Sequence, residues 1–314
     1  MKIGEEHHGF GKELTTMRYY VSVLAAALVA GCTMDQAAAP DTRSFSDADA
    51  QLVGREVAGE VEDVAGEFTI GSLFVPAFPS AGVAPPASAG EDPRPAATNC
   101  PTITPFPPVD TDGDHVPDDV TLSFTLPDCS FTRDGRTLEI TGTIHITDPS
   151  TTQFGARAEF ADFQHKLTGT DGGFFLTRLN GARQVLRSAA GFSLIDSTTA
   201  DRESSEHGAA QLAKAWVVDF TADPGQTVDH ERGLPSGDLT VNGAMTWTRG
   251  TESHELAVTT VTPLHHDATC TARPKFTSGE LVVTKTGPNG TVTIDIVFNG
   301  CGVEPTVTVE RSAA

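Results

Sequence analysis

The sequence is poor in basic residues. Its 314 residues include 21 Lys and Arg against 42 Asp and Glu, which gives a formal net charge of −21. A protein that binds a nucleic-acid backbone needs a basic surface to displace counterions, and electrostatic binding to anionic lipid head groups needs the same. We therefore exclude nucleic acid as a partner. Any contact with a membrane has to depend on something other than surface charge.

Long apolar runs are also absent. The most apolar stretch is residues 21–30 (VSVLAAALVA), whereas a membrane-spanning helix needs about 20 such residues. The short basic lead Met17-Arg18 precedes this stretch, and its length is typical of the apolar part of an export signal. We interpret residues 1–31 as a signal region and expect the true start of translation to be Met17.

A cysteine follows the apolar stretch. Residues 28–32 (LVAGC) resemble the lipobox of bacterial lipoproteins. The resemblance implies cleavage before Cys32, diacylation of Cys32 and a mature chain that begins at this residue. Position 33 is Thr rather than Asp, which favours the outer membrane of the cell envelope over the inner one. We expect a membrane anchor made by lipid at Cys32; the alternative is a plain secretory signal that happens to contain a cysteine.

Motifs of catalysis are missing as well. The sequence contains no G-x-S-x-G nucleophile elbow and no Gly-rich phosphate loop. The pair His254-Glu255 begins like the H-E-x-x-H metalloprotease motif, but Val258 stands where the second His belongs, in a segment with the pattern of a strand. We interpret residues 265–267 (HHD) as a polar turn. We therefore assign no catalytic residue.

The mature chain divides into four parts by composition. Residues 32–45 form a small polar tether, and residues 46–75 contain an amphipathic helix whose apolar positions recur at three- to five-residue steps. Ser46 and Asp49 supply a capping signal at its start. Residues 76–108 are a connector with ten of the 20 prolines, typical of an extended spacer. Residues 109–314 follow as the main domain.

The main domain has the two-residue period of β-strands. In residues 292–298, for example, Val, Ile, Ile and Phe alternate with Thr, Asp and Val, so one face of the strand is apolar. We predict an all-β fold, an antiparallel meander of about a dozen strands closed as a barrel or folded as a sandwich, and exclude a doubly wound parallel sheet. Trp216 and Trp247 are in phase with apolar neighbours, which favours a place in the core over a sugar-binding face. The expected hairpin turns are Asp134-Gly135, Asp171-Gly172, Asn180-Gly181 and Asn289-Gly290.

Four cysteines remain besides Cys32. They are Cys100, Cys129, Cys270 and Cys301. An even number in an exported chain indicates two disulfides, for which the sequence allows three pairings. We favour Cys100–Cys129 and Cys270–Cys301, because each pair encloses one local unit. A Cys₄ zinc site is the alternative, but such sites pair their cysteines at C-x₂₋₄-C and none of these lie so close.

One loop concentrates carboxylates. Residues 109–119 (VDTDGDHVPDD) alternate Asp with small residues, and calcium prefers six to eight oxygen ligands. The run is similar to the calcium repeats of thrombospondin type 3 domains, although His115 stands where the repeat has Gly and only one copy is present. An Asp-rich solvated turn is the alternative. We predict a structural calcium site. The resemblance implies Asp110, Asp112, Asp114 and Asp118 as side-chain ligands; the Val116 carbonyl falls where calcium loops use a backbone oxygen, and Asp119 is available to complete the shell.

The sequence thus predicts a lipid-anchored β protein outside the cytoplasm, acting as a non-enzymatic binding or structural surface protein with structural calcium as its cofactor. Two alternatives remain at this point. The first is an exported hydrolase, for example one acting on glycans, with a site assembled from distant residues. The second is a carrier of small hydrophobic ligands inside a β-barrel.

Overall fold

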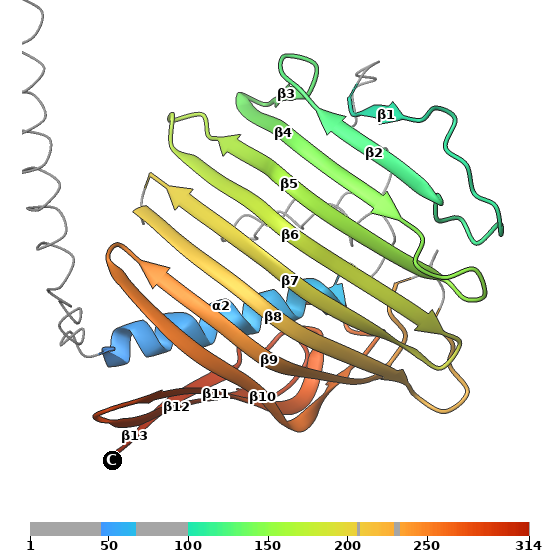
Figure 1. Cartoon of the computed structure of the whole chain (residues 1–314). Coiled ribbons are helices and arrows are strands. Elements are labelled where there is room, and N and C mark those ends of the chain that lie inside the picture. The colour runs from blue at the N-terminus through green and yellow to red at the C-terminus, as the bar shows by residue number, and fades with distance from the viewer. Residues whose placement is uncertain (1–44, 67–99, 206–207, 229–232, 314) are drawn as a thin grey trace, which may run out of the picture. The chain divides into compact units, whose positions relative to one another are not determined.

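The alternating segments form one antiparallel sheet in the computed structural model (Figure 1). The structure describes residues 45–66, 100–205, 208–228 and 233–313, so the signal region, Cys32 and most of the connector lie outside the described residues. The elements are α2 (Asp47–Gly66), β1 (Thr102–Thr104), β2 (Asp119–Phe124), β3 (Ser130–Arg133), β4 (Arg136–Thr147), β5 (Gly155–Thr168), β6 (Phe174–Ser188), β7 (Gly191–Ser204), β8 (Gly208–Ala222), β9 (Gly237–Arg249), β10 (Glu252–His266), β11 (Phe276–Gly287), β12 (Gly290–Phe298) and β13 (Thr306–Ser312).

The sheet is a meander. The strand order is β1-β2-β4 and then consecutively to β13, while β3 pairs with the first part of β4, in line with β2. This confirms the predicted all-β antiparallel fold. Within the described residues, β1 and β13 each have one strand neighbour, so the sheet is open and the closed-barrel alternative is wrong. The sheet also begins earlier than the sequence indicates, because β1 lies inside the Pro-rich connector.

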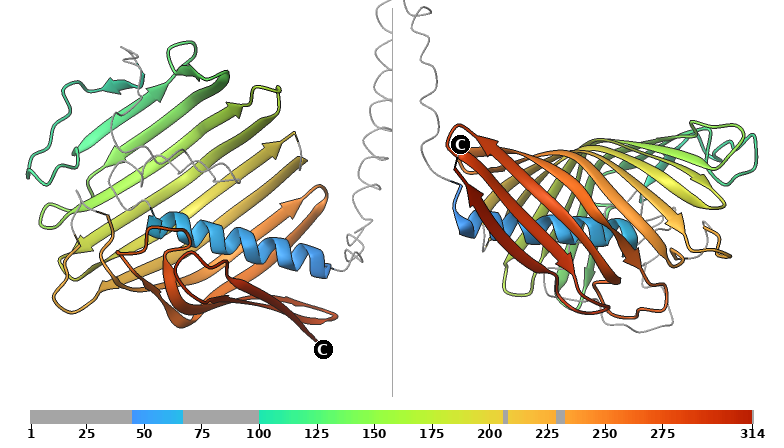
Figure 2. Two further views of the ribbon diagram at one scale, coloured as in Figure 1. Left: turned by 180° about the vertical axis from the view of Figure 1, so that it is seen from behind. Right: turned by 90° about the horizontal axis from the view of Figure 1, so that it is seen from below.

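Helix α2 lies on one face of the sheet, and the C-terminal strands curl toward it (Figure 2). Ser46 and Asp49 cap its first turn as predicted: the Asp49 N–H donates to Ser46 Oγ at 3.1 Å, and the Ser46 N–H donates to Asp49 Oδ2 at 3.1 Å. Gly54 permits a close approach, since a Cβ there would lie 2.6 Å from Val307 Cγ1 and 3.1 Å from Ile294 Cγ2. None of the helical residues that the structure describes belongs to an apolar segment of membrane-spanning length.

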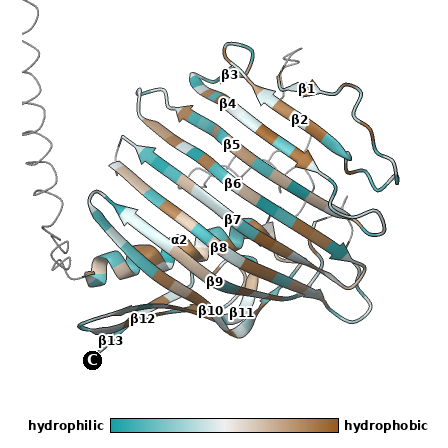
Figure 3. Cartoon of the chain, viewed as in Figure 1, coloured by the Kyte–Doolittle hydropathy of each residue, from teal (hydrophilic) through white to brown (hydrophobic). Residues whose placement is uncertain are grey.

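The core lies between α2 and the sheet face turned toward it. Along each strand, apolar and polar residues alternate in bands (Figure 3), and the apolar set is buried. Trp216 and Trp247 are each 1% exposed, which confirms their place in the core. Full burial of a large apolar side chain contributes about 1.5–3 kcal/mol, so this face supplies most of the stability that positions the polar groups described below.

One predicted turn is wrong. Asn180-Gly181 lies in the middle of β6 rather than in a hairpin. Gly181 has the expected positive φ of 109°, but here it allows close strand contact, because a Cβ would lie 2.2 Å from the carbonyl oxygen of Ser197. The Asn180 side chain accepts a hydrogen bond from the Asp162 N–H at 2.8 Å, where β5 has an irregular register. The Asn-Gly pair therefore accommodates a bulge in a neighbouring strand.

Two disulfides join the pairs favoured from the sequence. Cys100–Cys129 ties the segment just before β1 to the residue before β3, and Cys270–Cys301 ties the β10–β11 loop to the β12–β13 loop. Both bonds close loops of about 30 residues, which on the chain-entropy estimate contributes about 3–4 kcal/mol each. The cysteine sulfurs are therefore consumed in pairs, and the zinc alternative is wrong.

Candidate functional site

The Asp-rich loop between β1 and β2 brings three carboxylates together. Asp110, Asp112 and Asp114 each offer an oxygen, and these oxygens lie within 4.8 Å of one another. Asp110 and Asp112 are exposed, and Asp114 is half-buried. Carboxylate oxygens are the ligands that a hard cation such as calcium prefers, and this group would supply three of the six to eight that calcium takes.

The local backbone explains why these side chains converge. Gly113 and His115 have positive φ values of 77° and 74°, so the chain turns sharply at both residues. The Asp110 carboxylate accepts hydrogen bonds from the N–H groups of both, at 2.7 and 3.1 Å. Asp114 accepts one from the Val116 N–H at 2.8 Å, and the Val116 side chain is fully buried. His115 therefore takes a left-handed conformation, which Gly adopts most readily.

Two of the predicted ligands have other partners. The Asp118 carboxylate accepts two hydrogen bonds from Thr111, at 2.9 Å from N–H and 2.5 Å from Oγ1, which lower the pKa of Asp118. Asp119 is the first residue of β2, and its Oδ1 lies 2.9 Å from Nε2 of His145 on β4. Three of the predicted side-chain ligands therefore lie together. Asp118 and Asp119 instead interact with Thr111 and His145.

Sequence reasoning missed a fourth carboxylate beside the loop. Asp148 follows β4, and burial raises its pKa, as do the charges of Asp114, Asp112 and Asp118. The Oδ2 atom of Asp114 is buried without a hydrogen-bond partner. Among the described residues, no Lys or Arg forms an ion pair with these carboxylates. Asp119, at the end of the Asp-rich loop, pairs with Thr147 of β4, and Asp148 is the residue after Thr147. Without this strand register, the sequence does not indicate that Asp148 lies beside the loop.

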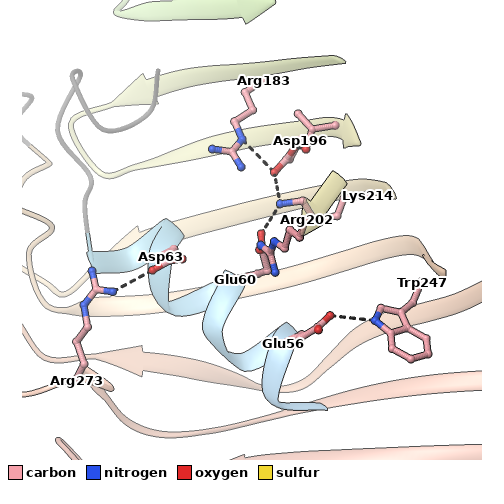
Figure 4. Close-up of polar contacts among 10 residues, drawn as sticks. Glu56, Glu60, Asp63, Arg183, Asp196, Arg202, Lys214, Trp247 and Arg273 are labelled. Carbon is pink, nitrogen blue, oxygen red and sulfur yellow. Dashed lines mark hydrogen bonds and ion pairs between the residues drawn. The ribbon is translucent and has the colours of Figure 1, made fainter. Parts of the chain in front are cut away.

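A second group of charged side chains is buried between α2 and the sheet (Figure 4). Glu60 comes from α2, Arg183 from β6, Asp196 and Arg202 from β7, and Lys214 from β8. We call these five residues the buried charge cluster. The side chains of Asp196 and Lys214 are 2% and 3% exposed, which is unusual for charged groups unless they are paired.

Each carboxylate of the buried charge cluster contacts two cations. Lys214 Nζ lies 2.5 Å from Glu60 Oε2 and 3.2 Å from Asp196 Oδ2, so it bridges helix and sheet. Glu60 also binds the guanidinium of Arg202, and Asp196 binds Nε of Arg183 at 3.1 Å. The arrangement is therefore a chain of alternating charges that runs from α2 to β6.

The pKa directions agree with this pairing. Burial alone would raise the pKa of Glu60, but Lys214 and then Arg202 more than offset it, and the pKa lies well below its usual range. The pKa of Asp196 is also lowered, because Arg183 and Lys214 outweigh the effect of burial. Both carboxylates are thus ionised at neutral pH, and each is compensated by two cations of the cluster.

Further acids of α2 face the sheet with raised pKa values. Glu56 accepts a hydrogen bond from Trp247 Nε1 at 3.1 Å, and burial raises its pKa. Glu62 is 7% exposed and accepts the Lys275 N–H at 3.1 and 3.2 Å. Burial raises the pKa of Glu62 to about 7. Protonated and ionised forms of this one side chain therefore coexist near neutral pH.

A cavity of about 920 Å³ runs along the polar side of α2. Asp63 forms an ion pair with Arg273 at 2.9 Å on its wall, and Arg202 is already bound to Glu60. Most of the charged wall is therefore engaged within the protein itself. The wall residues are Gln51, Arg55, Glu56, Ala58, Gly59, Glu60, Glu62, Asp63, Arg202, Arg273, Pro274, Gly302, Glu304, Pro305 and Val307.

The histidines considered above as candidates for catalysis all lie in β10, where each contacts neighbouring residues of the sheet or its loops. His254 lies in β10, is 3% exposed and stacks on Trp247 with ring centroids 5.9 Å apart. His266 is buried, and its Nδ1 lies 3.0 Å from the carbonyl oxygen of Pro235. His265 lies 2.9 Å from Asp238 on β9; both histidines end β10, so the predicted polar turn at residues 265–267 is wrong for them. These contacts spread the histidines over several places instead of collecting them around one cleft.

Sequence reasoning overlooked the buried charge cluster, although one signal for it was present. In β8, Lys214 falls in phase with Leu212 and Trp216, and in β7, Asp196 falls in phase with Leu194. A charged residue in an apolar row indicates a buried ion pair.

Comparisons with protein-family models, curated proteins and solved structures find no match for the chain. The fold places the described part of the chain in the class of all-β proteins, with one open antiparallel sheet that curls over one helix.

Proposed function

We propose that the chain is an exported lipoprotein of a bacterial cell envelope, anchored by lipid at Cys32 and located at the outer membrane. Two observations support this proposal. Residues 28–32 carry the lipobox-like pattern, and the body contains two disulfides, which persist in oxidising compartments and are rare in the cytosol. The lipid would make the membrane contact that the surface charge of this acidic protein does not favour.

The β body then acts as a non-enzymatic binding or structural module. The observation that supports this non-enzymatic role is the pairing in the buried charge cluster, where each carboxylate contacts two cations. Lys214 Nζ lies within 3.2 Å of both Glu60 and Asp196, so its charge serves to join α2 to the sheet. Catalytic sites instead direct titratable groups with poised pKa values at a substrate. The hydrolase alternative gains no support from this cluster.

The Asp-rich loop contributes a structural calcium site to the same body. Asp110, Asp112 and Asp114 would hold the ion, and the buried, unpartnered Oδ2 of Asp114 supports the assignment. Asp148 adds negative charge from the end of β4. Asp118, Asp119 and the Val116 carbonyl stay predictions as ligands. The ion would neutralise the carboxylates and fix the chain between β1 and β2.

Fractionation of cells that express the full chain tests the anchor. We expect the wild-type protein in the outer-membrane fraction, with a mass that matches cleavage before Cys32 plus the acyl chains. The variant Cys32→Ala should be neither acylated nor retained in that fraction. An unprocessed wild-type chain with free thiols in the cytosol would overturn the proposal.

Calorimetric titration of metal-free protein with calcium tests the ion site. We expect one site in the wild type and at least a tenfold weaker affinity in Asp114→Asn, because the variant removes a ligand charge. Asp134→Asn is the matched control, since Asp134 is an exposed turn residue with a positive φ of 51° that Asn also tolerates. Equal affinities in all three proteins would contradict the site.

A further inference from the structure

The two edges of the sheet differ in how they are protected. Edge strands present unpaired backbone groups that can recruit another strand, and natural proteins shorten or block such edges. β1 has three residues, lies between Pro101 and Pro105 and follows a disulfide-bonded cysteine. β13 has seven residues and contains no proline. It pairs with β12 in an unbroken register from Thr306 to Ser312. β13 is therefore the edge at which strand addition is possible.

Backbone groups of alternate β13 residues point away from β12. In an antiparallel ladder, every second residue directs its N–H and C=O outward. The Val307 carbonyl accepts a hydrogen bond from Gln51 of α2 at 3.0 Å, which places Val307 in the outward set and leaves the second lone pair of this carbonyl for a strand partner. By alternation, Val309 and Arg311 belong to the same set. In the part of the chain that the structure describes, β12 is the one strand neighbour of β13.

We propose that β13 pairs with β13 of a second copy of the chain, antiparallel and centred on Val309. In this register Val309 lies opposite itself, Thr308 opposite Glu310, and Val307 opposite Arg311. Thr306 then lies opposite Ser312. No two like charges are directly opposed, and Thr308 supplies a hydroxyl donor next to a carboxylate. A two-fold axis closes the assembly at two copies, because the other edge of each sheet is β1.

The position of α2 fits this dimer. A Cβ on Gly54 would meet both Val307 of β13 and Ile294 of β12, and α2 packs against both strands, so the helix lies over them. With strands about 4.8 Å apart, the two-fold axis would place the two α2 helices about 10 Å apart on the same face of the joined sheet. Packed helices lie about 8–10 Å apart. The pairing thus joins two sheets and brings two helices to contact distance.

Site-specific cross-linking of the full chain tests the proposed register. The variant Val309→Cys should give a disulfide-linked dimer under mild oxidation, since its two copies lie directly opposite each other. The matched control Val307→Cys should stay monomeric under the same conditions, because residue 307 of one copy faces residue 311 of the other. The wild type controls for linkage through Cys32. Cross-linking of Val307→Cys without Val309→Cys would overturn the proposal.

Sedimentation velocity of the same chain tests the assembly. We expect the wild type to be dimeric. Val309→Pro should weaken dimerisation at least tenfold, because proline removes the outward N–H at the centre of the pairing. Thr308→Ala keeps the backbone of the strand and should remain dimeric. A wild type that stays monomeric over the whole accessible concentration range would contradict the proposal, whichever way Val309→Pro behaves.

Discussion

The two acidic regions of this protein handle negative charge in opposite ways. In the Asp-rich loop, Asp110, Asp112 and Asp114 converge at the surface, and no Lys or Arg of the described residues pairs with them. In the buried charge cluster, Glu60 and Asp196 lie deep in the core, and each contacts two cations. Side chains of the described residues therefore leave the charge of the loop uncompensated, whereas each carboxylate of the cluster is compensated by cations of the chain itself.

The largest loss in the free energy of unfolding is expected when a cation of the buried charge cluster is removed. Lys214→Ala leaves Glu60 and Asp196 buried with one cation fewer each, and loss of one partner of a buried pair costs about 3–5 kcal/mol. Urea unfolding of the full chain should show this loss. Arg133→Ala is the control, because the Arg133–Asp134 pair is exposed and should change stability by less than about 1 kcal/mol. Equal effects in both variants would show that the cluster does not join α2 to the sheet.

A second prediction concerns pH. Burial raises the pKa of Glu62 to about 7, so the folded state favours its protonated form. The groups that face Glu62 are Asp63 on its own helix, Arg273 and the Lys275 N–H on the β10–β11 connection, and the Phe276 N–H at the start of β11. The contribution of Glu62 to stability is complete below about pH 4.5 and is lost as pH rises through 7, which amounts to about 3 kcal/mol.

The variant Glu62→Gln isolates this effect from other titrations. It keeps an oxygen acceptor for the Lys275 N–H but carries no charge. We expect wild type and variant to be similarly stable at pH 4.5, and the variant to be more stable at pH 8, as measured by urea unfolding at both values. A difference between the two proteins that does not change with pH would refute the prediction.

The smallest effects are expected from two glycines of the helix that carries Glu60. At Gly54 a Cβ would lie 2.6 Å from Val307 Cγ1, so Gly54→Ala should separate helix and sheet and destabilise by about 1–3 kcal/mol. At Gly59 no atom lies within 4 Å of such a Cβ, so Gly59→Ala should stabilise by up to about 1 kcal/mol. Thermal melting of both variants checks these signs. Two changes of the same sign would show that α2 does not contact β12 and β13 as described.

Local patterns predicted much of the fold. The alternation in β12, the cap made by Ser46 and Asp49, and both disulfide pairs are properties of short segments, and each could be predicted from the sequence. The Asn180-Gly181 turn was wrong because a positive φ serves a hairpin and a bulge equally well. Whether the sheet closes depends on how all the strands of the described residues twist together, and no single segment encodes that property.

The two sites could likewise be predicted only where their residues lie close in sequence. The Asp-rich loop could be predicted because its carboxylates are close in sequence, and residues 110–114 supply all three that converge. The buried charge cluster joins Glu60 to Lys214 across 154 positions, so its ion pairs depend on where α2 docks. Lys214 stands out in the apolar row of β8, but the sequence does not identify its partner.

Thermal unfolding of the full chain, with calcium or with excess chelator, tests the contrast between the two acidic regions most directly. Calcium at one hundred times its dissociation constant should stabilise the wild type by about 2.7 kcal/mol. The loop variant Asp112→Asn should lose most of this response. Lys214→Ala should keep it in full at a lower melting temperature. Superimposable wild-type curves with and without calcium, on protein shown to begin metal-free, would contradict the account.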